Sequence, residues 1–258
     1  MKLTHKLCGA ALLATVGVAV AIPNTTKAVE HSLEGKGHIG FTKDTGTKTL
    51  TDPGSTSSGV VITSNSTLPM TDPGEFGIIA VTPLEFRTHS VLTADESFNA
   101  SLYEANGSAY NPAAPATTKD IQNFVAFYDG RENARTYNLS AKSTKFTEGT
   151  TKELAGTQIT YSNMWMNTHA GGESPDVLAA SQVLKTDGTS TKFISNDVVA
   201  TGTKGFGQHE INFGEVSKNG AAGGADQAVT LAVPKADNPV IVSGDYTATI
   251  TWTLADVR

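Results

Sequence analysis

Histidines close to carboxylates are the first residues in this sequence whose types could support chemistry. His169 lies four residues before Glu173, and His209 is followed directly by Glu210. Neither pair has the i, i+4 histidine spacing that a helical zinc site requires. Both pairs lie among strand-like and glycine-rich segments, so we expect surface or turn histidines and no metal site.

Other catalytic groups are scarce. Asp129 and Glu132 could form the paired acids of a secreted carbohydrate-active enzyme, but separation in space rather than in sequence decides that role. The single cysteine is Cys8, and the sequence contains neither a Gly-x-Ser-x-Gly elbow nor a glycine-rich phosphate loop before a helix. We therefore expect a protein that is not an enzyme and that uses no cofactor, with the carbohydrate-active enzyme as a weaker alternative.

The N-terminal segment has the order of a secretory signal peptide. Lys2 and Lys6 precede an apolar stretch from residue 7 to residue 22, and Thr26-Lys27-Ala28 supplies a small-residue cleavage site. We expect cleavage after Ala28. The apolar stretch is shorter than the roughly 20 residues of a spanning helix, and no later segment comes close, so no membrane span is predicted.

Composition limits the partners of the exported chain. Cys8 leaves with the signal peptide, so the remaining chain has no disulfides and must be held by its core. Cleavage removes Lys2, Lys6 and Lys27, which leaves 16 of the 19 basic residues. Against 25 acidic residues, the net charge changes from -6 to -9. This charge argues against nucleic acid and anionic polymers as partners. The remaining chain, about 230 residues long, can bury one sizeable core.

Short apolar runs between Thr-, Ser-, Gly- and Asn-rich turns predict an all-β fold. We expect an antiparallel β-sandwich or a partly closed barrel, with at most one short helix. That helix would be residues 174–184, where Ser174 could cap and Pro175 suits the first turn, although a strand is the alternative. The predicted strands are residues 37–43, 76–88, 97–105, 124–130, 135–143, 157–166, 191–197, 208–215, 227–234 and 246–254.

A linker is predicted between the isolated first strand and the remaining strands. Residues 44–74 are rich in Ser, Thr, Gly and Pro and contain Thr-Asp-Pro-Gly twice, a sequence suited to tight turns. Leu-Pro-Met-Thr-Asp at 68–72 is similar to the sortase sorting motif but lacks its final glycine and tail. We expect a mobile linker and no covalent anchor. The predicted division is 1–28 signal peptide, 29–74 strand and linker, and 75–258 β domain.

The final predicted strand is the most regular one. Tyr246, Ala248, Ile250, Trp252 and Leu254 alternate with four threonines. This period of two is typical of a half-buried antiparallel strand. One face of the strand is therefore apolar and the other carries hydroxyl groups.

Residues 244–256, Gly-Asp-Tyr-Thr-Ala-Thr-Ile-Thr-Trp-Thr-Leu-Ala-Asp, preceded by 229–237, closely resemble the C-terminal motif of the WxL domain. This domain is a cell-surface module of low-GC Gram-positive bacteria. An earlier family motif resembles residues 128–141, where Asp129 and Arg131 have the matching offset and Leu139 keeps the leucine. Tyr137 stands in the tryptophan position. Residues 84–91 and 202–214 also fit, so the resemblance spans nearly all of the exported chain.

The resemblance implies non-covalent attachment to the bacterial cell wall, with peptidoglycan as the ligand. It also implies companion WxL-interacting surface proteins as partners, which makes the chain a secreted component of a cell-surface complex. The site residues that it implies for wall or partner binding are Asp129, Arg131, Tyr137, Leu139, Trp252 and Leu254.

A structural role for the same residues is the alternative. Trp252 and Leu254 share a strand face with Ile250, so a core position explains them without a ligand. We expect Trp252 and Tyr137 to point inward. Asp129 and Arg131 could form a surface ion pair or fix the loop before Tyr137. The ligand could also be another protein, bound by a structural or adhesive subunit through an exposed strand edge.

Overall fold

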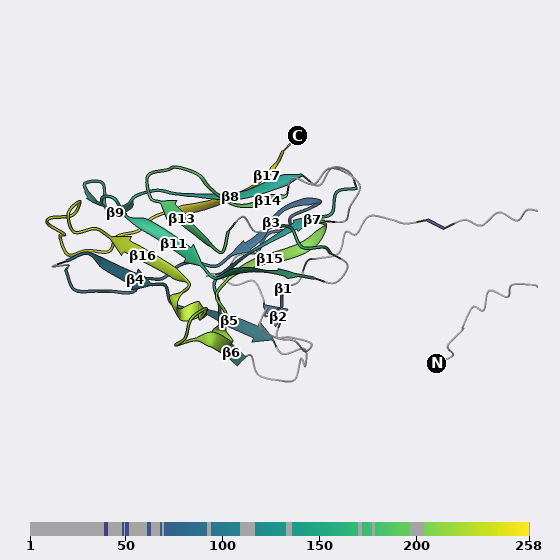
Figure 1. Ribbon diagram of the computed structural model, residues 1–258, viewed down its shortest axis with the longest axis horizontal. Helices are drawn as coiled ribbons and strands as arrows, with labels where there is room; N and C mark the ends of the chain where they lie inside the picture. Colours follow the sequence, from purple (N-terminus) through teal and green to yellow (C-terminus); the bar gives the residue numbers. More distant parts are fainter. Residues whose placement is uncertain are drawn as a thin grey trace, which may run out of the picture. The chain divides into compact units, whose positions relative to one another are not determined.

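The structure is a computed structural model of the chain (Figure 1). Its contacts divide the chain into two compact units, residues 1–42 and 43–258. In the first unit only Ile39 and Gly40 are described, and neither is part of a strand. The structure describes residues 39–40, 48, 50–51, 61–62, 68, 70–91, 94–108, 117–132, 136–169, 172–176, 179–196 and 204–257.

The described part of the second unit is built almost entirely from antiparallel strands, and the all-β prediction is confirmed. Two 3-10 helices of three residues each, η1 (Val216–Lys218) and η2 (Ala225–Gln227), are the helices in this part. The strands are β1 (Leu50–Thr51), β2 (Val61–Ile62), β3 (Phe76–Val81), β4 (Glu96–Asn99), β5 (Tyr103–Ser108), β6 (Thr117–Ile121), β7 (Phe124–Asp129), β8 (Tyr137–Ser143), β9 (Phe146–Glu148), β10 (Lys152–Leu154), β11 (Gln158–Ser162), β12 (Met164–Thr168), β13 (Ser181–Lys185), β14 (Thr191–Asn196), β15 (Gly207–Phe213), β16 (Val229–Val233) and β17 (Ile250–Asp256).

The strands form a layered sandwich of open sheets. Their orders are β12-β15-β7-β3, β14-β8-β17, β13-β11-β16-β4 and β1-β2-β5-β6, with β9 and β10 as a separate pair. Figure 1 shows β8, β14 and β17 side by side, with β15, β7 and β3 in a neighbouring layer. None of these sheets closes into a barrel.

Strand β7 explains the layering because every one of its six residues is buried. Val125 and Phe127 belong to one apolar cluster, the main core, while Phe124, Ala126 and Tyr128 belong to another, the second core. An antiparallel strand normally buries one face, whereas an uninterrupted apolar run is buried on both. The sheet that contains β7 is therefore a middle layer between two cores.

The main core lies between this middle layer and the sheets of β8 and β11, and it holds the apolar and aromatic residues of the two motifs. Its large side chains include Tyr137, Leu139, Tyr161, Phe193, Phe213 and Trp252. The second core joins the middle layer to β1, β2, β5 and β6. It includes Leu50, Ile62, Leu68, Ile79, Tyr103 and Ile121.

The second core draws on residues from the predicted linker. Leu50, Ile62 and Leu68 are fully or almost fully buried, and β1 pairs with β2, which pairs in turn with β5. Most of residues 44–74 lies outside the described residues, so the predicted mobility and the boundary at residue 74 stay predictions. The same is true of the predicted signal peptide and, apart from Ile39 and Gly40, of the predicted strand 37–43.

The helix predicted at 174–184 is wrong, and the alternative, a strand, is confirmed for its last residues. Ser181–Lys185 is strand β13, which pairs with β11, and Leu184 faces the main core while its neighbours Val183 and Lys185 are exposed. Pairing with β11 decides the conformation of this short apolar run, which periodicity alone does not. Within the described part of the chain, no helix has the length and apolar character to cross a membrane.

Several strand boundaries also differ from the predictions. The strand expected at 76–88 ends at Val81, two residues before Pro83, which has no N–H for a sheet ladder. The run 157–166 divides between β11 and β12 at Asn163, whose φ is 52°. The run 97–105 likewise divides between β4 and β5, and the final strand begins at Ile250 rather than Tyr246.

Candidate functional site

The two motif strands, β8 and β17, are hydrogen-bonded neighbours in one sheet. Leu139 lies directly opposite Leu254, Tyr137 opposite Asp256, and Ala141 opposite Trp252. The strands are antiparallel, so the two aromatic residues lie on opposite sides of the Leu–Leu pair. The prediction that both motifs share one domain with few helices is confirmed. The register relates the two motifs by a local twofold axis that passes near the Leu139–Leu254 pair.

Trp252 is 9% exposed and belongs to the main core. Its ring centroid lies 4.6 Å from that of Phe193, 5.8 Å from that of Tyr161 and 6.2 Å from that of Phe213. Ala141, the residue across the strand pair, is small and leaves room for the indole. The prediction that Trp252 points inward is confirmed, and the aromatic cluster gives it a packing role.

Tyr137 is fully buried, so its predicted inward orientation is also confirmed. Its ring contacts those of Phe127 and Phe76, and its hydroxyl donates a hydrogen bond to the carbonyl oxygen of Gly205 at 3.1 Å. Burial raises the pKa of this hydroxyl far above its ordinary value of 10. Gly205 has φ of 77°, and a Cβ there would meet Asn196 and the Tyr137 hydroxyl, so glycine is required.

Asp129 and Arg131 form a buried ion pair rather than the surface pair that we considered. The Asp129 carboxylate is 0% exposed and the Arg131 side chain 14% exposed. Arg131 donates from Nε to Oδ1 at 2.9 Å and from Nη2 to Oδ2 at 2.8 Å, which is the strong bidentate geometry. Its backbone N–H also donates to Oδ1, at 3.1 Å.

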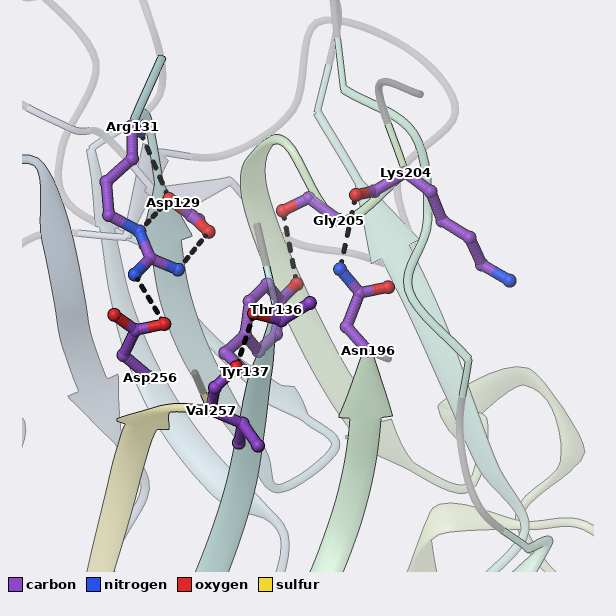
Figure 2. A network of polar contacts seen from close by, with 9 residues as sticks. All are labelled: Asp129, Arg131, Thr136, Tyr137, Asn196, Lys204, Gly205, Asp256 and Val257. Atoms are coloured by element: carbon purple, nitrogen blue, oxygen red, sulfur yellow. Dashed lines mark hydrogen bonds and ion pairs between the residues drawn. The ribbon is translucent and has the colours of Figure 1, made fainter. Parts of the chain in front are cut away.

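The same guanidinium reaches the C-terminal motif strand. Nη1 of Arg131 lies 3.1 Å from Oδ1 of Asp256. The central carbon of the guanidinium, Cζ, lies 3.9 Å from the centroid of the Phe76 ring, a cation–π contact. The hydrogen bond with Asp129, opposed by burial and aided by both carboxylates, raises the pKa of Arg131. Figure 2 shows these groups gathered where β17 ends and β8 begins.

A second link joins the two motif segments beside this ion pair. Thr136 donates from its hydroxyl to the carbonyl oxygen of Val257 at 2.5 Å, and the N–H of Val257 donates to the carbonyl oxygen of Thr136 at 3.2 Å. Asn196 donates to the carbonyl oxygen of Lys204 at 3.2 Å, next to the Tyr137 bond (Figure 2). We call the contacts of Asp129, Arg131, Tyr137, Asp256 and Val257 the polar clamp. Its contacts are intramolecular, and they hold strand ends together.

A cleft of about 730 Å³ opens near the other end of the same strand pair. Its walls are two segments without regular secondary structure, residues 82–91 and 241–248. Its floor comes from the main core and includes Tyr161, Leu231 and Trp252. We call this feature the aromatic cleft. Sequence reasoning missed it, because its two walls are 150 residues apart and because residues 82–88 and 246–248 were predicted to be strand rather than irregular.

Comparison with known proteins gives one match. The family model described as "WxL domain surface cell wall-binding" matches residues 28–257. The chain belongs to the WxL domain family. No curated protein and no solved structure matches it. The predicted resemblance is confirmed, and the match supports a surface protein that binds the cell wall.

The structure separates the six predicted site residues of this WxL domain into three groups. Asp129, Arg131 and Tyr137 belong to the polar clamp, and Leu139 pairs with Leu254 between the two ends of the strand pair. Trp252 alone among the six lines the aromatic cleft. The motif is therefore mainly part of the fold, with one residue in contact with a concave surface.

His209 contradicts the prediction of surface histidines. It lies on β15 and is fully buried. Its ring lies on the face of the middle layer that points to the main core, and its centroid is 5.3 Å from that of Phe127. Its Nδ1 is 3.0 Å from the hydroxyl of Thr168. Burial lowers the pKa of His209 from 6.5 to about 4, so the ring is neutral at pH 7. The prediction failed because alternation along β15 turns His209 to the same face as Ile211 and Phe213, which the main core covers.

His169 and Glu210 come together on the other side of β15. His169 Nε2 lies 2.8 Å from Oε1 of the buried Glu210, and Asn167 donates to Oε2 at 2.9 Å. His169 itself is about a quarter exposed. Glu173 pairs instead with Lys204 through a backbone bridge. Among the described residues, no group of three or more His, Cys, Asp and Glu side chains could hold a metal ion.

Proposed function

We propose that this WxL domain protein is exported and attaches non-covalently to the bacterial cell wall, with peptidoglycan as its ligand. The observation that carries the proposal is the family match over residues 28–257, nearly the whole chain. The order of charges and apolar residues before Ala28 supports export. The net charge of -9 after cleavage supports a ligand other than an anionic polymer.

The proposal assigns the motif residues an indirect role. Asp129, Arg131 and Tyr137 meet other groups of the chain through their polar atoms, and Leu139 is fully buried. A wall polymer would have to displace these contacts to reach them. Their part in wall binding is therefore to hold β8 and β17 in register, while the ligand binds elsewhere.

We further propose that the protein works in a surface complex with companion WxL-interacting proteins and has no catalytic role. The family resemblance supports the complex. The burial of Asp129 in its ion pair with Arg131, beside an exposed Glu132, supports the absence of a glycosidase acid pair there.

Retention on washed, protein-free cell walls tests the proposal. The chain, produced with its own N-terminal segment in a secreting host, should sediment with the walls at low and at high salt, because the ligand is not recognised through net charge. Walls digested to soluble glycan fragments should release it. Failure to sediment with protein-free walls, together with binding to walls that keep their proteins, would contradict wall attachment and favour a protein ligand.

A further inference from the structure

The aromatic cleft has a wall that is pre-formed by its own side chains. Arg87 has φ of 63°, which is unusual for a residue with a side chain, and its N–H donates to Oε1 of Glu85 at 2.7 Å. The Arg87 Nε donates to the hydroxyl of Ser101 at 2.8 Å. Strained backbone that its surroundings hold in place is often found at binding sites. The bend in residues 85–87 is thus fixed from within the segment and by Ser101, which lies between β4 and β5.

Two aromatic contacts attach this wall to the sandwich. The ring of His89 stacks on that of Phe98 at 4.0 Å, and its Nε2 donates to the carbonyl oxygen of Phe86 at 2.6 Å. Phe86 packs edge-on against Phe146, with 6.2 Å between the ring centroids. All four residues line the cleft.

The opposite wall, residues 241–248, is also held in place. Thr247 exchanges two backbone hydrogen bonds with Thr147, both 2.9 Å long. Gly244 lies so close to Glu148 that a Cβ would be 2.9 Å from its side chain, and Tyr246 donates to the carbonyl oxygen of Val242 at 2.8 Å. The cleft is therefore open and pre-formed, with a volume in the range of small-ligand sites.

The lining combines aromatic and aliphatic side chains with hydroxyl groups and carries little net charge. Phe86, Phe98, Phe146, Tyr246 and Trp252 supply rings, while Thr88, Ser90, Ser243 and Thr247 supply hydroxyl groups. The charged residues are Glu85, Arg87 and Asp245, with His89 as the one titratable imidazole. One cation against two anions gives no attraction for an anionic polymer.

We propose that the aromatic cleft binds a neutral pyranose chain of the cell wall. A sugar ring presents C–H groups on its faces and hydroxyl groups at its edge, which match aromatic rings and polar side chains arranged around one channel. The exposed part of Trp252 then lies at the floor of the ligand site. This inference rests on the proposed wall attachment and names the surface that performs it.

A cleft-filling substitution tests the proposal without touching the core. Ser243 is exposed and lines the cleft, so Ser243→Trp should obstruct it while leaving the unfolding transition unchanged. Ser217→Trp is the matched control, because Ser217 is exposed on η1 and does not line the cleft. His89→Ala is the second variant, since it removes a ring from one wall.

The readouts are retention on protein-free walls and calorimetric titration with a soluble oligosaccharide of N-acetylglucosamine. We expect Ser243→Trp to weaken both at least about tenfold, the size of effect given by loss of one good contact, and Ser217→Trp to weaken neither. If the wild type and Ser243→Trp are retained on walls equally well, the cleft proposal is overturned, while wall attachment is still supported. If the wild type is not retained on walls, wall attachment itself is contradicted. The titration with the oligosaccharide would then still show whether the aromatic cleft binds a saccharide.

Two wall components could supply the pyranose chain. Walls stripped of their attached polysaccharides retain the glycan strands of peptidoglycan, so binding to stripped walls assigns the ligand to those strands. Binding only to unstripped walls assigns it to an attached polysaccharide. Binding to stripped walls that is lost in Ser243→Trp, without any oligosaccharide binding by the wild type, would overturn a saccharide ligand.

Discussion

The two ends of the β8–β17 strand pair carry the same motif and have opposite surroundings. At one end, the hydroxyl of Tyr137, the Asp129–Arg131 pair and Asp256 form the polar clamp. At the other, Trp252 faces Ala141 and forms part of the floor of the aromatic cleft. We call these the closed end and the open end.

The contrast follows from what lies opposite each aromatic residue. Asp256 opposite Tyr137 brings a carboxylate to the guanidinium of Arg131, which ties the strand ends together. Ala141 opposite Trp252 presents only a methyl group, and the indole is packed from below by Phe193 and Tyr161. Two motifs that occupy equivalent positions in an antiparallel strand pair therefore need not have the same function.

The largest expected effect on stability is at the open end. Trp252→Ala should lower the free energy of unfolding by about 3 to 5 kcal/mol, because it removes a large side chain from the main core and leaves a cavity. Wall binding should then be lost together with the fold. Chemical denaturation of the variant, compared with Trp165→Phe on the partly buried second tryptophan, measures the difference. A folded Trp252→Ala protein with unchanged stability and lost wall binding would make Trp252 a ligand residue only.

At the closed end, Asp129→Ala should cost about 3 kcal/mol, because it leaves the mostly buried Arg131 without its bidentate partner. The cost is at the lower end of the usual range, since Asp256 still neutralises part of the charge. Glu132→Ala, at an exposed neighbour, is the control and should change stability little. Equal unfolding midpoints for the two variants would show that the clamp does not hold the closed end.

Acid should weaken the protein through His209, next to the closed end. Its folded pKa of about 4 is below the unfolded value of 6.5, so the unfolded chain binds the extra proton between these pH values. The free energy of unfolding therefore falls as the pH is lowered from 6.5 toward 4, and His209 reduces it by about 2 kcal/mol at pH 5 relative to neutral pH. His209→Leu should flatten this part of the stability–pH curve. An unchanged curve would place the titration elsewhere.

The smallest expected effect comes from the hydroxyl of Tyr137. Tyr137→Phe should reduce stability by about 1 to 2 kcal/mol, because the carbonyl group of Gly205 loses its buried donor. Thermal unfolding measures this, and saccharide binding at the open end should be unaffected. Loss of binding with normal stability would show that the two ends are coupled.

Alternation and resemblance predicted much of this fold. The period of two around Trp252 indicated its inward side, and the uninterrupted apolar run of β7 appeared as a strand. The register that places Leu139 opposite Leu254 was not predictable, because it depends on pairing between residues more than a hundred positions apart. The burial of His209 depends on the pairing that places it opposite Phe127, on the face of β15 that the main core covers. The second core uses Leu50, Ile62 and Leu68, which the composition around them had assigned to a linker.

The site was less predictable than the fold. Asp129 and Arg131 were identified through the family motif, but their reach to Asp256 follows from the strand order β14-β8-β17. The aromatic cleft needs two irregular segments to meet over the main core, whereas the sequence pattern had assigned parts of both, residues 82–88 and 246–248, to strands. Contacts of each segment with β9, those of Phe86 with Phe146 and of Thr247 with Thr147, bring them together.

Fluorescence of Trp252 tests most directly the claim that the open end meets the ligand while the closed end serves the fold. The chain has two tryptophans, so Trp165→Phe leaves Trp252 as the single reporter at the floor of the aromatic cleft. We predict that titration with the soluble N-acetylglucosamine oligosaccharide shifts its emission saturably and protects it from an added quencher. Unchanged emission and quenching in a chain that still binds protein-free walls would contradict the account.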